Sequence, residues 1–559
     1  MPVITEEQLK HHNATLVSLE MLRLQWQKLW RELGDNYLPQ RYRWLMQAKE
    51  YYANRARRQY IINNTGTRAA RTLTAGMMNG VTSPSRPWFK LRVPGVNLDE
   101  HRSLAVWLEE VERRMLRIMA ESNFYNSMAT MYLDLVVFGT AANLIYEDFE
   151  SVIRCYNPPL GEYFIDQDDR GLVNTFARKF NISINNYISK WPNEQYWSDR
   201  VKNAVTQGGA ALHQDIEISH YVGKNTKNIA LPRFPFYELY WESKRQQTNT
   251  APQVLHKGGF YELPGIFARW EVSGTDAYGV SPGMDAIGDN IELQHLHRNK
   301  AELLEKMHKP SLLVDVQLQN EPLALMPNGH TYVPNLNNTS GAKPIHTVNP
   351  DFSQLAMDIQ LIEQRIKDTF FNFLFTGISD LPTVRSATEV DAREGEKLIL
   401  LGGVLERLES EALDPAIKRI FAIGTRANLL PPKPPEYAEV PLEIQYVSIL
   451  SVAQRAVGTA PAERWLGLVG NVLEVNPEAG DLTDYDKLLT NYARDIGLRE
   501  SELRSSEEVE ERRGLREQQQ QMEQMAAAAP PLTQGAKNLS ETEVGGGANA
   551  LEQLLGGGA

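Results

Sequence analysis

The segment GVSPG at 279–283 has the spacing of the G-x-S-x-G motif, in which a serine attacks a carbonyl carbon in acyl transfer. That chemistry needs an oxyanion hole, and the motif takes one donor from the backbone N–H of the residue after the serine. The residue after Ser281 is Pro282, which has no N–H. We therefore interpret the segment as a tight turn with a proline at a helix start. A hydrolase built on Ser281 stays as an alternative, which predicts loss of activity in Ser281→Ala.

Two glutamate–histidine pairs have the E-x-x-H spacing of carboxylate-bridged di-iron centres: Glu292 with His295, and Glu305 with His308. Those centres need the two motifs on different helices, with a glutamate from each of two more. Here both pairs fall on one expected helix, about 20 Å apart at 1.5 Å per residue. We interpret them as a solvated helix face, and we predict neither a metal site nor a cofactor.

Two further motifs are incomplete. The acidic segment 166–171 begins like a calcium-binding loop, but Arg170 stands at the fifth ligand position and Ala177 replaces the bidentate glutamate. We interpret it as an acidic turn. Lys224 follows a glycine, but no glycine stands five residues before that one, so the sequence has no Walker A loop there. Any ATP-driven step would need another chain, and we predict no enzyme activity and no catalytic residues.

Length and composition set further limits. The 559 residues correspond to three or four domains at about 150 residues each. Lys and Arg number 58 and Asp and Glu 70, a net charge of −12, which argues against tight non-specific binding to nucleic acid. The single cysteine, Cys155, excludes an intrachain disulfide. The N-terminus lacks a signal-peptide pattern, and no apolar run approaches the roughly 18 residues of a membrane span. We therefore expect a protein made in the cytosol, with no membrane partner.

The elements that would position functional residues begin with an expected helix at about 5–33, where apolar residues recur in steps of three and four. The next segment, 41–71, holds eight basic residues and one acid and is the most basic stretch of an acidic chain. We interpret it as a solvated helix face paired with acids elsewhere. The alternative is a contact with nucleic acid or an acidic partner. A further helical pattern spans 103–138.

The middle of the chain changes pattern twice. Alternating runs between about 141 and 269, such as FYELYW at 236–241, predict a β-rich region with short helices. Two long helices are then expected, at 282–308 and 351–375. They flank the proline-rich stretch 310–350, which predicts short extended segments.

The C-terminal part is expected to be helical again. A third long helix over about 386–423 should bend at two adjacent glycines and at Pro415. A strand over 441–447 and helices up to about residue 525 follow. The Ala-, Pro- and Gly-rich end of the chain predicts a disordered tail.

Several segments, taken in order, resemble the head-to-tail connector, or portal, proteins of short-tailed bacteriophages of the podovirus type. They are WRELGDNYLPQR (30–41), TLTAGMMNGVTSPSRPWFKL (72–91), AYGVSPGMDAIGDNIELQ (277–294), Lys309-Pro310 with the Pro-Asn-Gly of 327–329, SATEVDAREGEKLILLGGVLERLESEALDPAIKRIF (386–421) and IQYVSILSVAQR (444–455). The last segment departs from the family at Ile449, where a proline is usual. The matches span about residues 26 to 515, and their order and spacing together are specific.

The resemblance implies an α+β, mainly helical portal fold. Such subunits assemble as a closed ring, usually of about twelve copies, around an axial DNA channel. The parts of the fold map onto the chain in order: the wing at 1–280, stem helix 1 at 281–309, the clip at 310–350, stem helix 2 at 351–375, the tunnel loop at 376–388, a long bent helix with the wing return at 389–449, crown or barrel helices at 450–525 and the disordered tail at 526–559.

The implied function is that of a portal protein at one capsid vertex of the virion, made in the host bacterial cytoplasm. It would pass double-stranded DNA during packaging and ejection. Its partners would be the terminase large subunit, a tail adaptor protein, and the major capsid and scaffolding proteins. We assign the DNA channel to Arg385, Thr383 and Lys367, although a surface ion pair would explain each cation equally well.

The clip would project from the stem as a small exposed element, so we assign the contacts with the motor and the adaptor to Asn328, His330 and Lys343. Two other interpretations stay open. Another structural protein of the virion, from the tail or the internal core, would form no closed ring with an axial hole. A cytosolic coiled-coil scaffold is disfavoured by the mixed pattern of 141–269.

Overall fold

The protein is described by a computed structural model. The residues that it describes are 6–42, 61–94, 101–226, 229, 232–243, 254–308, 312–313, 343–344, 351–376, 401–437, 442–447, 465, 467, 469, 484–489, 508–523 and 537. The chain divides into two compact units. Unit 1 consists of Met1–Phe89, Glu112–Pro432 and Tyr446–Gly458, and unit 2 of Lys90–Val111, Lys433–Gln445 and Thr459–Ala559. Helices and sheets occur together in unit 1, which confirms the expected α+β class.

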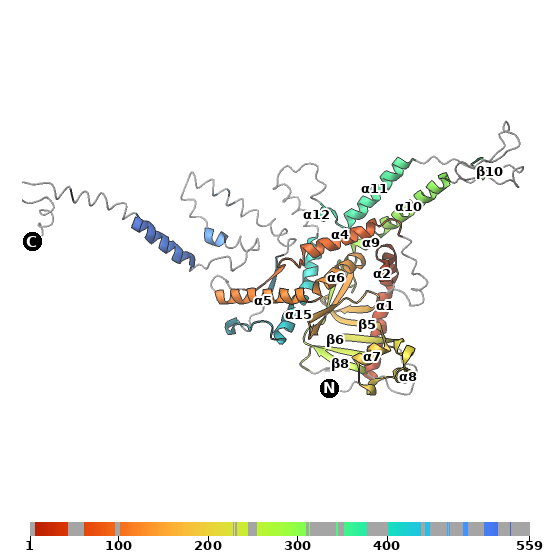
Figure 1. Ribbon diagram of the computed structural model, residues 1–559, viewed down its shortest axis with the longest axis horizontal. Coiled ribbons are helices and arrows are strands. Elements are labelled where there is room, and N and C mark those ends of the chain that lie inside the picture. Colours follow the sequence, from red (N-terminus) through yellow and green to blue (C-terminus); the bar gives the residue numbers. More distant parts are fainter. Residues whose placement is uncertain are drawn as a thin grey trace, which may run out of the picture. The chain divides into compact units, whose positions relative to one another are not determined.

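The larger sheet of unit 1 has five antiparallel strands in sequence order, β4-β5-β6-β7-β8 (Figure 1). The strands are β4 (Tyr163–Gln167), β5 (Val173–Ser183), β6 (Asp215–Lys224), β7 (Phe236–Glu242) and β8 (Val254–Phe260). Two helices, α7 (Ile184–Lys190) and α8 (Asp199–Gln207), lie in the connection from β5 to β6. This arrangement confirms the β-rich region with short helices that the alternating runs predicted.

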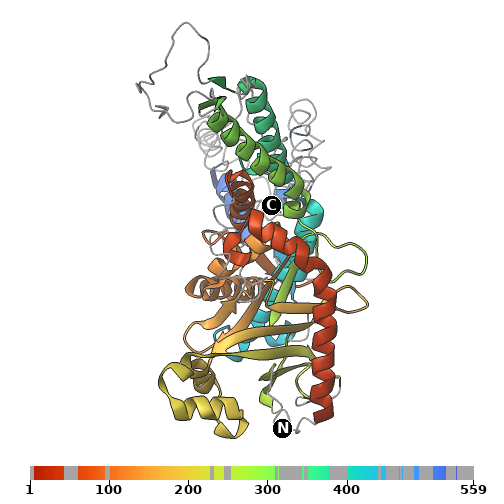
Figure 2. The same ribbon diagram turned by 90° about the vertical axis from the view of Figure 1, so that its right-hand side faces the viewer.

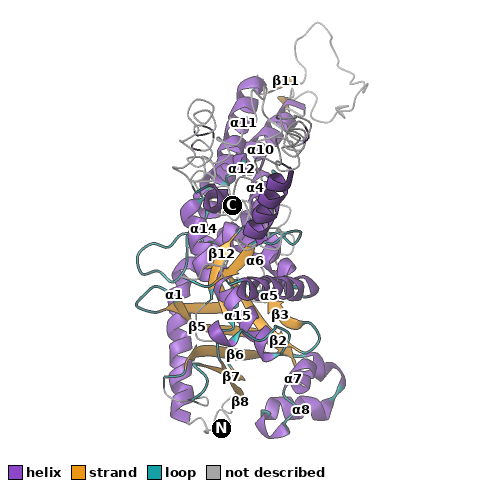
Figure 3. Ribbon diagram, turned by 90° about the vertical axis from the view of Figure 1, so that its left-hand side faces the viewer, coloured by secondary structure: helices purple, strands orange, loops and turns teal. Residues whose placement is uncertain are grey.

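Side chains of this sheet alternate between two faces, as the period of two along a strand requires. On β7, Leu239 and Trp241 are buried in one cluster with Leu16 of helix α1 (Glu6–Asn36). The intervening Tyr240 is buried in a second cluster with Tyr187 of α7. Helix α1 therefore covers one face of the sheet, and α7 with α8 covers part of the other. Figure 3 shows α1 beside the strands, with α7 and α8 at the other end.

A smaller sheet of three antiparallel strands has the order β3-β2-β9. Its strands are β2 (Thr140–Asp148), β3 (Val152–Tyr156) and β9 (Gly265–Arg269). Helix α6 (Phe124–Phe138) is largely buried and leads directly into β2 through Gly139. Gly139 has φ +77°, and a Cβ there would lie 2.2 Å from the carbonyl oxygen of Gly279. This turn therefore requires glycine.

The helical pattern predicted over 103–138 forms two helices, not one. Helix α5 (Arg102–Glu121) ends before α6 begins at Phe124. The Ser122 hydroxyl accepts a hydrogen bond from the Phe124 amide at 3.2 Å and donates one to the Met119 carbonyl at 3.0 Å. These hydrogen bonds of the Ser122 side chain replace backbone helix bonds between α5 and α6. The periodicity of apolar residues alone does not detect such a break.

Two helices of unit 1 lie side by side and form a hairpin (Figure 2). The first is α10 (Ile287–His308), which follows the short helix α9 (Pro282–Asp285), and the second is α11 (Phe352–Thr369). Between them, β10 (Leu312–Leu313) pairs with β11 (Lys343–Pro344). Helix α4 (Thr65–Gly80) packs against α11.

The helix predicted over 351–375 is shorter than expected, and this part of the prediction was wrong. Helix α11 ends at Thr369, a turn follows in which Phe371 has φ +53°, and a separate helix α12 begins at Phe373 and ends at Thr376. Phe370 is fully buried against the Tyr37 ring, at 5.7 Å between centroids. Because Phe370 is buried at this turn, the apolar pattern of the sequence continues past the end of α11. The pattern therefore did not reveal where the helix ends.

Residues 402–426 form a continuous helical segment of three parts. Helix α14 (Gly402–Leu408) continues as a π-helical turn (Glu409–Leu413) and then as α15 (Asp414–Arg426). The adjacent glycines are the first two residues of α14, and Pro415 lies in the first turn of α15. The part of the predicted helix before residue 401 lies outside the described residues.

The remaining described elements lie outside the sheets and helices above. They are α2 (Pro39–Tyr42), 3-10 turns at Glu194–Tyr196, Gly209–His213 and Pro435–Tyr437, the pair of β1 (Phe89–Arg92) with β12 (Glu443–Tyr446), and helical residues at 485–489 and 508–523. Strand β12 confirms the predicted strand over 441–447. The predicted tunnel loop, apart from Thr376, and the predicted disordered tail, apart from Lys537, lie outside the described residues. No helix in the described ranges is both long and apolar enough to span a bilayer.

Candidate functional site

The hairpin of α10 and α11 carries part of the predicted functional segment. Lys367 lies on α11 and is exposed, and Lys343 lies in β11, where its strand pairs with β10. The other assigned residues lie outside the described residues: Arg385, Thr383, Asn328 and His330. Strands β10 and β11 bring the two ends of the proline-rich stretch together, at the far ends of the two helices.

Apolar packing holds the base of the hairpin. Ile359, Ile362 and Ile366 are buried on α11, at the steps of three and four that form one helix face. On α10, Leu293 is fully buried. Helix α11 packs on both α10 and α4, so this apolar face fixes the hairpin to the rest of unit 1.

A polar cluster ties the segment before α4 to both helices of the hairpin. The Gln294 side chain accepts hydrogen bonds from the amides of Ile62 and Asn63 at 2.9 and 3.0 Å, and it donates one to the Asn63 carbonyl at 2.7 Å. The Asn63 amide group donates to Glu363 Oε1 at 2.7 Å and lies 2.9 Å from His297 Nε2. One asparagine thus links α10 and α11 through side-chain contacts at a single level of the hairpin.

The charge on the hairpin is mixed. Helices α10 and α11 together carry seven carboxylates and five Lys or Arg side chains. Arg365 Nη2 lies 3.1 Å from Asp289 and 3.3 Å from Glu292, in pairs that solvent partly screens. Within the described ranges, Lys367 makes no ion pair, so its charge is free to meet a ligand or solvent.

Ser281 caps a helix. Its hydroxyl donates a hydrogen bond to the Val137 carbonyl at 2.7 Å and accepts one from the Met284 amide at 3.1 Å. The side chain is 1% exposed. A substrate carbonyl could not reach this oxygen without breaking the cap, so the prediction of a turn with a proline helix start is confirmed.

The other two motifs are also structural. Glu292, His295, Glu305 and His308 are exposed on α10, as the solvated-face interpretation predicted. In the acidic turn between β4 and β5, Asp168 Oδ1 accepts hydrogen bonds from the amides of Arg170 and Leu172 at 3.1 and 3.0 Å. Where the chain is described, no group of three His, Cys, Asp or Glu residues is arranged to hold a metal ion.

The basic segment 41–71 is described only at its two ends. Arg41 Nε lies 3.2 Å from Asp134, which is buried on α6. Burial raises the pKa of Asp134 to about 6, and Arg41 opposes this shift. For Arg41 the expected pairing with an acid elsewhere is therefore correct. Arg68 and Arg71 are exposed on α4, and residues 43–60 lie outside the described residues.

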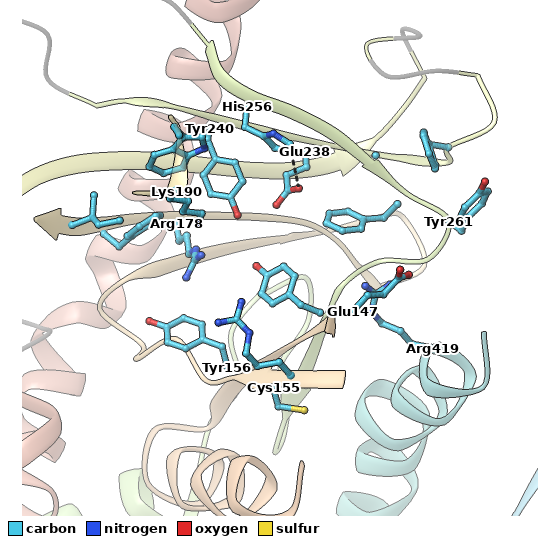
Figure 4. A pocket seen from close by; sticks show the side chains of 18 of the residues that line it. Glu147, Cys155, Tyr156, Arg178, Lys190, Glu238, Tyr240, His256, Tyr261 and Arg419 are labelled. Atoms are coloured by element: carbon cyan, nitrogen blue, oxygen red, sulfur yellow. Dashed lines mark ion pairs between the residues drawn. The ribbon is translucent and has the colours of Figure 1, made fainter. Parts of the chain in front are cut away.

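A second candidate site is a cavity of about 940 Å³ in unit 1 (Figure 4). It lies between the two sheets, with lining residues from β2, β3, β5, β7 and β8 and from α7 and α15. In Figure 4, Lys190, Arg178 and Tyr240 lie together at one end, and Glu147, Arg419 and Tyr261 lie at the other. The lining is rich in cations and aromatic rings.

Buried hydrogen bonds hold Arg178 in place at the Lys190 end of the cavity. Arg178 Nε donates to His220 Nδ1 at 3.1 Å, and its Nη1 donates to Glu162 Oε1 at 3.2 Å. Burial lowers the pKa of His220 to about 4, so its imidazole is neutral at pH 7. His220 Nε2 lies 2.9 Å from Glu238 Oε1, which leaves Nδ1 as the acceptor and Nε2 as the donor.

Aromatic rings hold the cation of Lys190. Its Nζ lies 4.7 Å from the ring centroid of Tyr240, 4.9 Å from that of Trp191 and 5.8 Å from that of Phe180. The Tyr240 ring also stacks on His220, at 4.1 Å and an interplanar angle of 1°. Burial lowers the pKa of Lys190 to about 8, and the charge of Arg178 acts in the same direction.

The sequence predicted none of the residues in this cavity. Arg154, Arg178 and Lys190 come from β3, β5 and α7, and no motif links them. The alternation of the FYELYW strand does place Glu238 and Tyr240 on one face, but it does not say which other elements meet that face. Only the pairing of distant segments brings these charges together.

The sequence is similar to known proteins over most of its length. Residues 9–503 match the family described as "Bacteriophage head to tail connecting protein". The chain is 35% identical over 483 residues to the "Probable portal protein" of Bordetella phage BPP-1, and the match covers 85% of each chain. It is 33% identical over 536 residues to the "Portal protein" of Salmonella phage epsilon15, with 95% of each chain covered. Both helices of the hairpin and both sheets of unit 1 lie inside the family match.

Proposed function

The chain belongs to the family of bacteriophage head-to-tail connecting proteins, and we propose that it forms the ring-shaped DNA channel of a phage portal. Its role as a head-to-tail connector follows from the family and from the portal proteins that it resembles at 33% and 35% identity. The family is structural, which makes the chain a component of the virion. We extend this to a place at one capsid vertex, to synthesis in the host cytoplasm and to the absence of enzyme activity.

The helical hairpin carries this proposal. Two helices, α10 and α11, lie side by side, and the proline-rich stretch 310–350 joins their far ends through the pair of β10 and β11. In the proposed arrangement α10 and α11 are the stem, and the stretch between them is the clip. The sheets of unit 1 belong to the wing, residues 376–388 to the tunnel loop, and residues 450–525 to the crown.

A ring explains how one chain could make a channel. Head-to-tail contacts between identical subunits close into a ring when the rotation per subunit divides a full turn. We propose about twelve copies, with the hairpins side by side around the axis. A single copy would then contribute one face of its hairpin to the channel.

The mixed charge of the hairpin suits a channel through which DNA slides. Each cation that neutralises a phosphate releases counterions and strengthens binding, so a channel lined with many cations would hold the DNA in place. The seven carboxylates of α10 and α11 outnumber their five Lys and Arg residues. We propose that Lys367, with Arg385 and Thr383 of the tunnel loop, contacts the DNA backbone.

The clip is the proposed binding site of the packaging motor and the tail adaptor. We assign these contacts to Asn328, His330 and Lys343, with the terminase large subunit and a tail adaptor protein as partners. The major capsid and scaffolding proteins would contact other surfaces. The second candidate function is another structural role in the virion, in the tail or the internal core, which would not need a closed ring.

Native mass measurement with negative-stain imaging of the full chain tests the ring. We expect particles of about a dozen copies with an axial hole, either for the chain alone or when it is expressed with its scaffolding protein. A chain that stays monomeric or dimeric with scaffolding protein present would contradict the ring, and it would favour the other virion roles.

A further inference from the structure

Three cations, Lys190, Arg154 and Arg178, line one end of the cavity between the two sheets of unit 1. Within the described part of the chain, neither Lys190 nor Arg154 forms an ion pair. Lys190 rests on aromatic rings instead, with its Nζ 4.7 Å from the Tyr240 centroid. Arg154 is exposed on β3 at the same cavity. An exposed ammonium held on aromatic rings, beside an exposed guanidinium that forms no ion pair among the described residues, is a site for an anion.

Arg178 adds hydrogen-bond donors to the same end. Its side chain is 7% exposed, and two of its nitrogens are used, Nε for His220 and Nη1 for Glu162. Its Nη2 has no acceptor among the described residues, although an arginine can donate from all three nitrogens. The buried Tyr146 hydroxyl interacts with the Tyr240 side chain but, in the described ranges, donates no hydrogen bond to an acceptor. These are unused donors in a cavity wall.

Two carboxylates, Glu162 and Glu238, lie near this end. Glu162 accepts from Arg178 and from the Tyr156 hydroxyl, at 3.0 Å in the shorter contact to Tyr156. Glu238 lies 2.9 Å from the neutral His220, so it keeps its negative charge, and that charge also acts on Lys190. Three cations therefore face two carboxylates, and the cations approach from β3, β5 and α7.

The other end of the cavity is balanced and does not compete for an anion. Arg426 is 2.6 Å from Glu147 and 2.8 Å from Glu262, and Arg419 Nε donates to the Ile145 carbonyl at 2.7 Å. An anion would therefore bind at the Lys190 end. Figure 4 shows Lys190 and Arg178 there, apart from Arg419.

We propose that this cavity of the wing binds a phosphate group between Lys190, Arg154 and Arg178. Donors that converge from three elements match an oxyanion with three free oxygens better than the two oxygens of a carboxylate. The phosphate could belong to a free nucleotide, which a cavity of about 940 Å³ can hold, or to the backbone of DNA. This binding site goes beyond the connector role and does not require the ring.

Calorimetric titration of the purified full chain tests the site, with inorganic phosphate, dAMP and a short DNA duplex as separate probes. We expect saturable binding of at least one probe, with one site per chain. Lys190→Met keeps the aliphatic stem between the rings without the charge, and Arg154→Gln changes an exposed side chain. Each should weaken binding by about tenfold or more, as the loss of a charge-assisted hydrogen bond predicts.

Two control variants make the result specific. Lys202→Met removes an exposed charge on α8, away from the cavity, and should leave binding unchanged. Lys190→Arg keeps the charge and should retain most of the affinity, which separates loss of charge from a disturbed fold. Binding of dAMP without the duplex would identify a free nucleotide, and binding of the duplex without dAMP would identify the DNA backbone.

The proposal would be overturned by either of two results. One is that none of the three probes binds up to millimolar concentration. The other is that binding occurs but Lys190→Met and Arg154→Gln change it no more than Lys202→Met does. In the first case, binding of an acidic peptide instead would indicate a protein partner for the cavity.

Discussion

Arg269 and Glu411 form a two-point ion pair between segments 142 residues apart. Arg269 Nε donates to Glu411 Oε2 at 3.0 Å, and Nη2 lies 2.7 Å from Oε1. The Arg269 side chain is 3% exposed, and it also donates to Gln167 and to the Gly171 carbonyl. One guanidinium thus joins strand β9, the π-helical turn and the turn between β4 and β5. This contact joins the segment after the hairpin to the sheets of unit 1.

Removal of the Glu411 charge should destabilise unit 1. In Glu411→Gln the buried Arg269 charge loses its partner, and breaking a buried pair in this way lowers the free energy of unfolding by about 3 kcal/mol or more. Glu406→Gln is the matched control, because Glu406 is exposed on α14, and its effect should stay within about 0.5 kcal/mol. Urea unfolding of both variants at pH 7 is the measurement. Equal stability of the two variants would show that the pair contributes little.

His220 should make stability depend on pH between about 4 and 6.5. Burial lowers its pKa from 6.5 to about 4, so in that range the unfolded chain binds more protons than the folded one. The free energy of unfolding should therefore fall as the pH falls through this window, by at most about 3 kcal/mol from this group. The charges that face the imidazole are Glu238, Arg178 and Lys190.

The test of this pH dependence compares wild type with His220→Gln, in urea unfolding at pH 7 and pH 5. The comparison is needed because Asp134 acts in the opposite direction. Burial raises the pKa of Asp134 to about 6, so its contribution to stability increases as the pH falls toward its ordinary value of 3.8. We expect the wild type to lose more stability than the variant between the two pH values. Parallel losses would rule out His220 as the titrating group.

The fold of unit 1 was predictable where local patterns decide it. The alternation of side chains in β6 and β7 and the apolar stripe of α1 each reflect the burial of one face of the element. The proline at the start of α9 reflects the cap of that helix. The positions at which a helix is interrupted were not predictable in the same way. Phe371 has a positive φ between α11 and α12, and the buried contact of Phe370 with Tyr37, more than 300 residues earlier, helps to stabilise that turn.

Of the two candidate sites, one could be predicted from local motifs and the other could not. The likeness to portal proteins came from ordered motifs, and it located the hairpin and Lys367. The cavity could not be found in this way, because Lys190 meets Tyr240 only after β5, β6 and β7 have paired. Ser281 illustrates the opposite case. One local fact, that Pro282 has no N–H, was enough to reject a motif that its spacing supported.

Close packing at Gly66 should be essential to the base of the hairpin. A Cβ at this position of α4 would lie 2.7 Å from the Tyr37 ring and 2.7 Å from Asn290 Oδ1, and both side chains are buried. We expect Gly66→Ala to lower the free energy of unfolding by about 1–3 kcal/mol, as overpacking does. Gly288→Ala on α10 is the control. Nothing lies within 4 Å of its added Cβ, so it should raise stability by up to about 1 kcal/mol. Thermal unfolding checks both, and a neutral Gly66→Ala would mean that α4 and α10 can separate.

Lys367 should contact DNA if the hairpin lines the channel. Its side chain is exposed and, as far as the chain is described, makes no ion pair, so Lys367→Gln should leave the mass and the melting temperature of the ring unchanged. Each lost phosphate contact should weaken the affinity of the ring for duplex DNA and make the slope of log K against log salt less negative by about 0.9. DNA binding by the assembled ring, measured over a range of salt concentrations, gives that slope. Lys202→Gln on α8 should reproduce the wild-type slope, because Lys202 is exposed and does not lie on the hairpin. An intact Lys367→Gln ring with the wild-type slope would place Lys367 outside the channel, and another face of the hairpin would then have to line it.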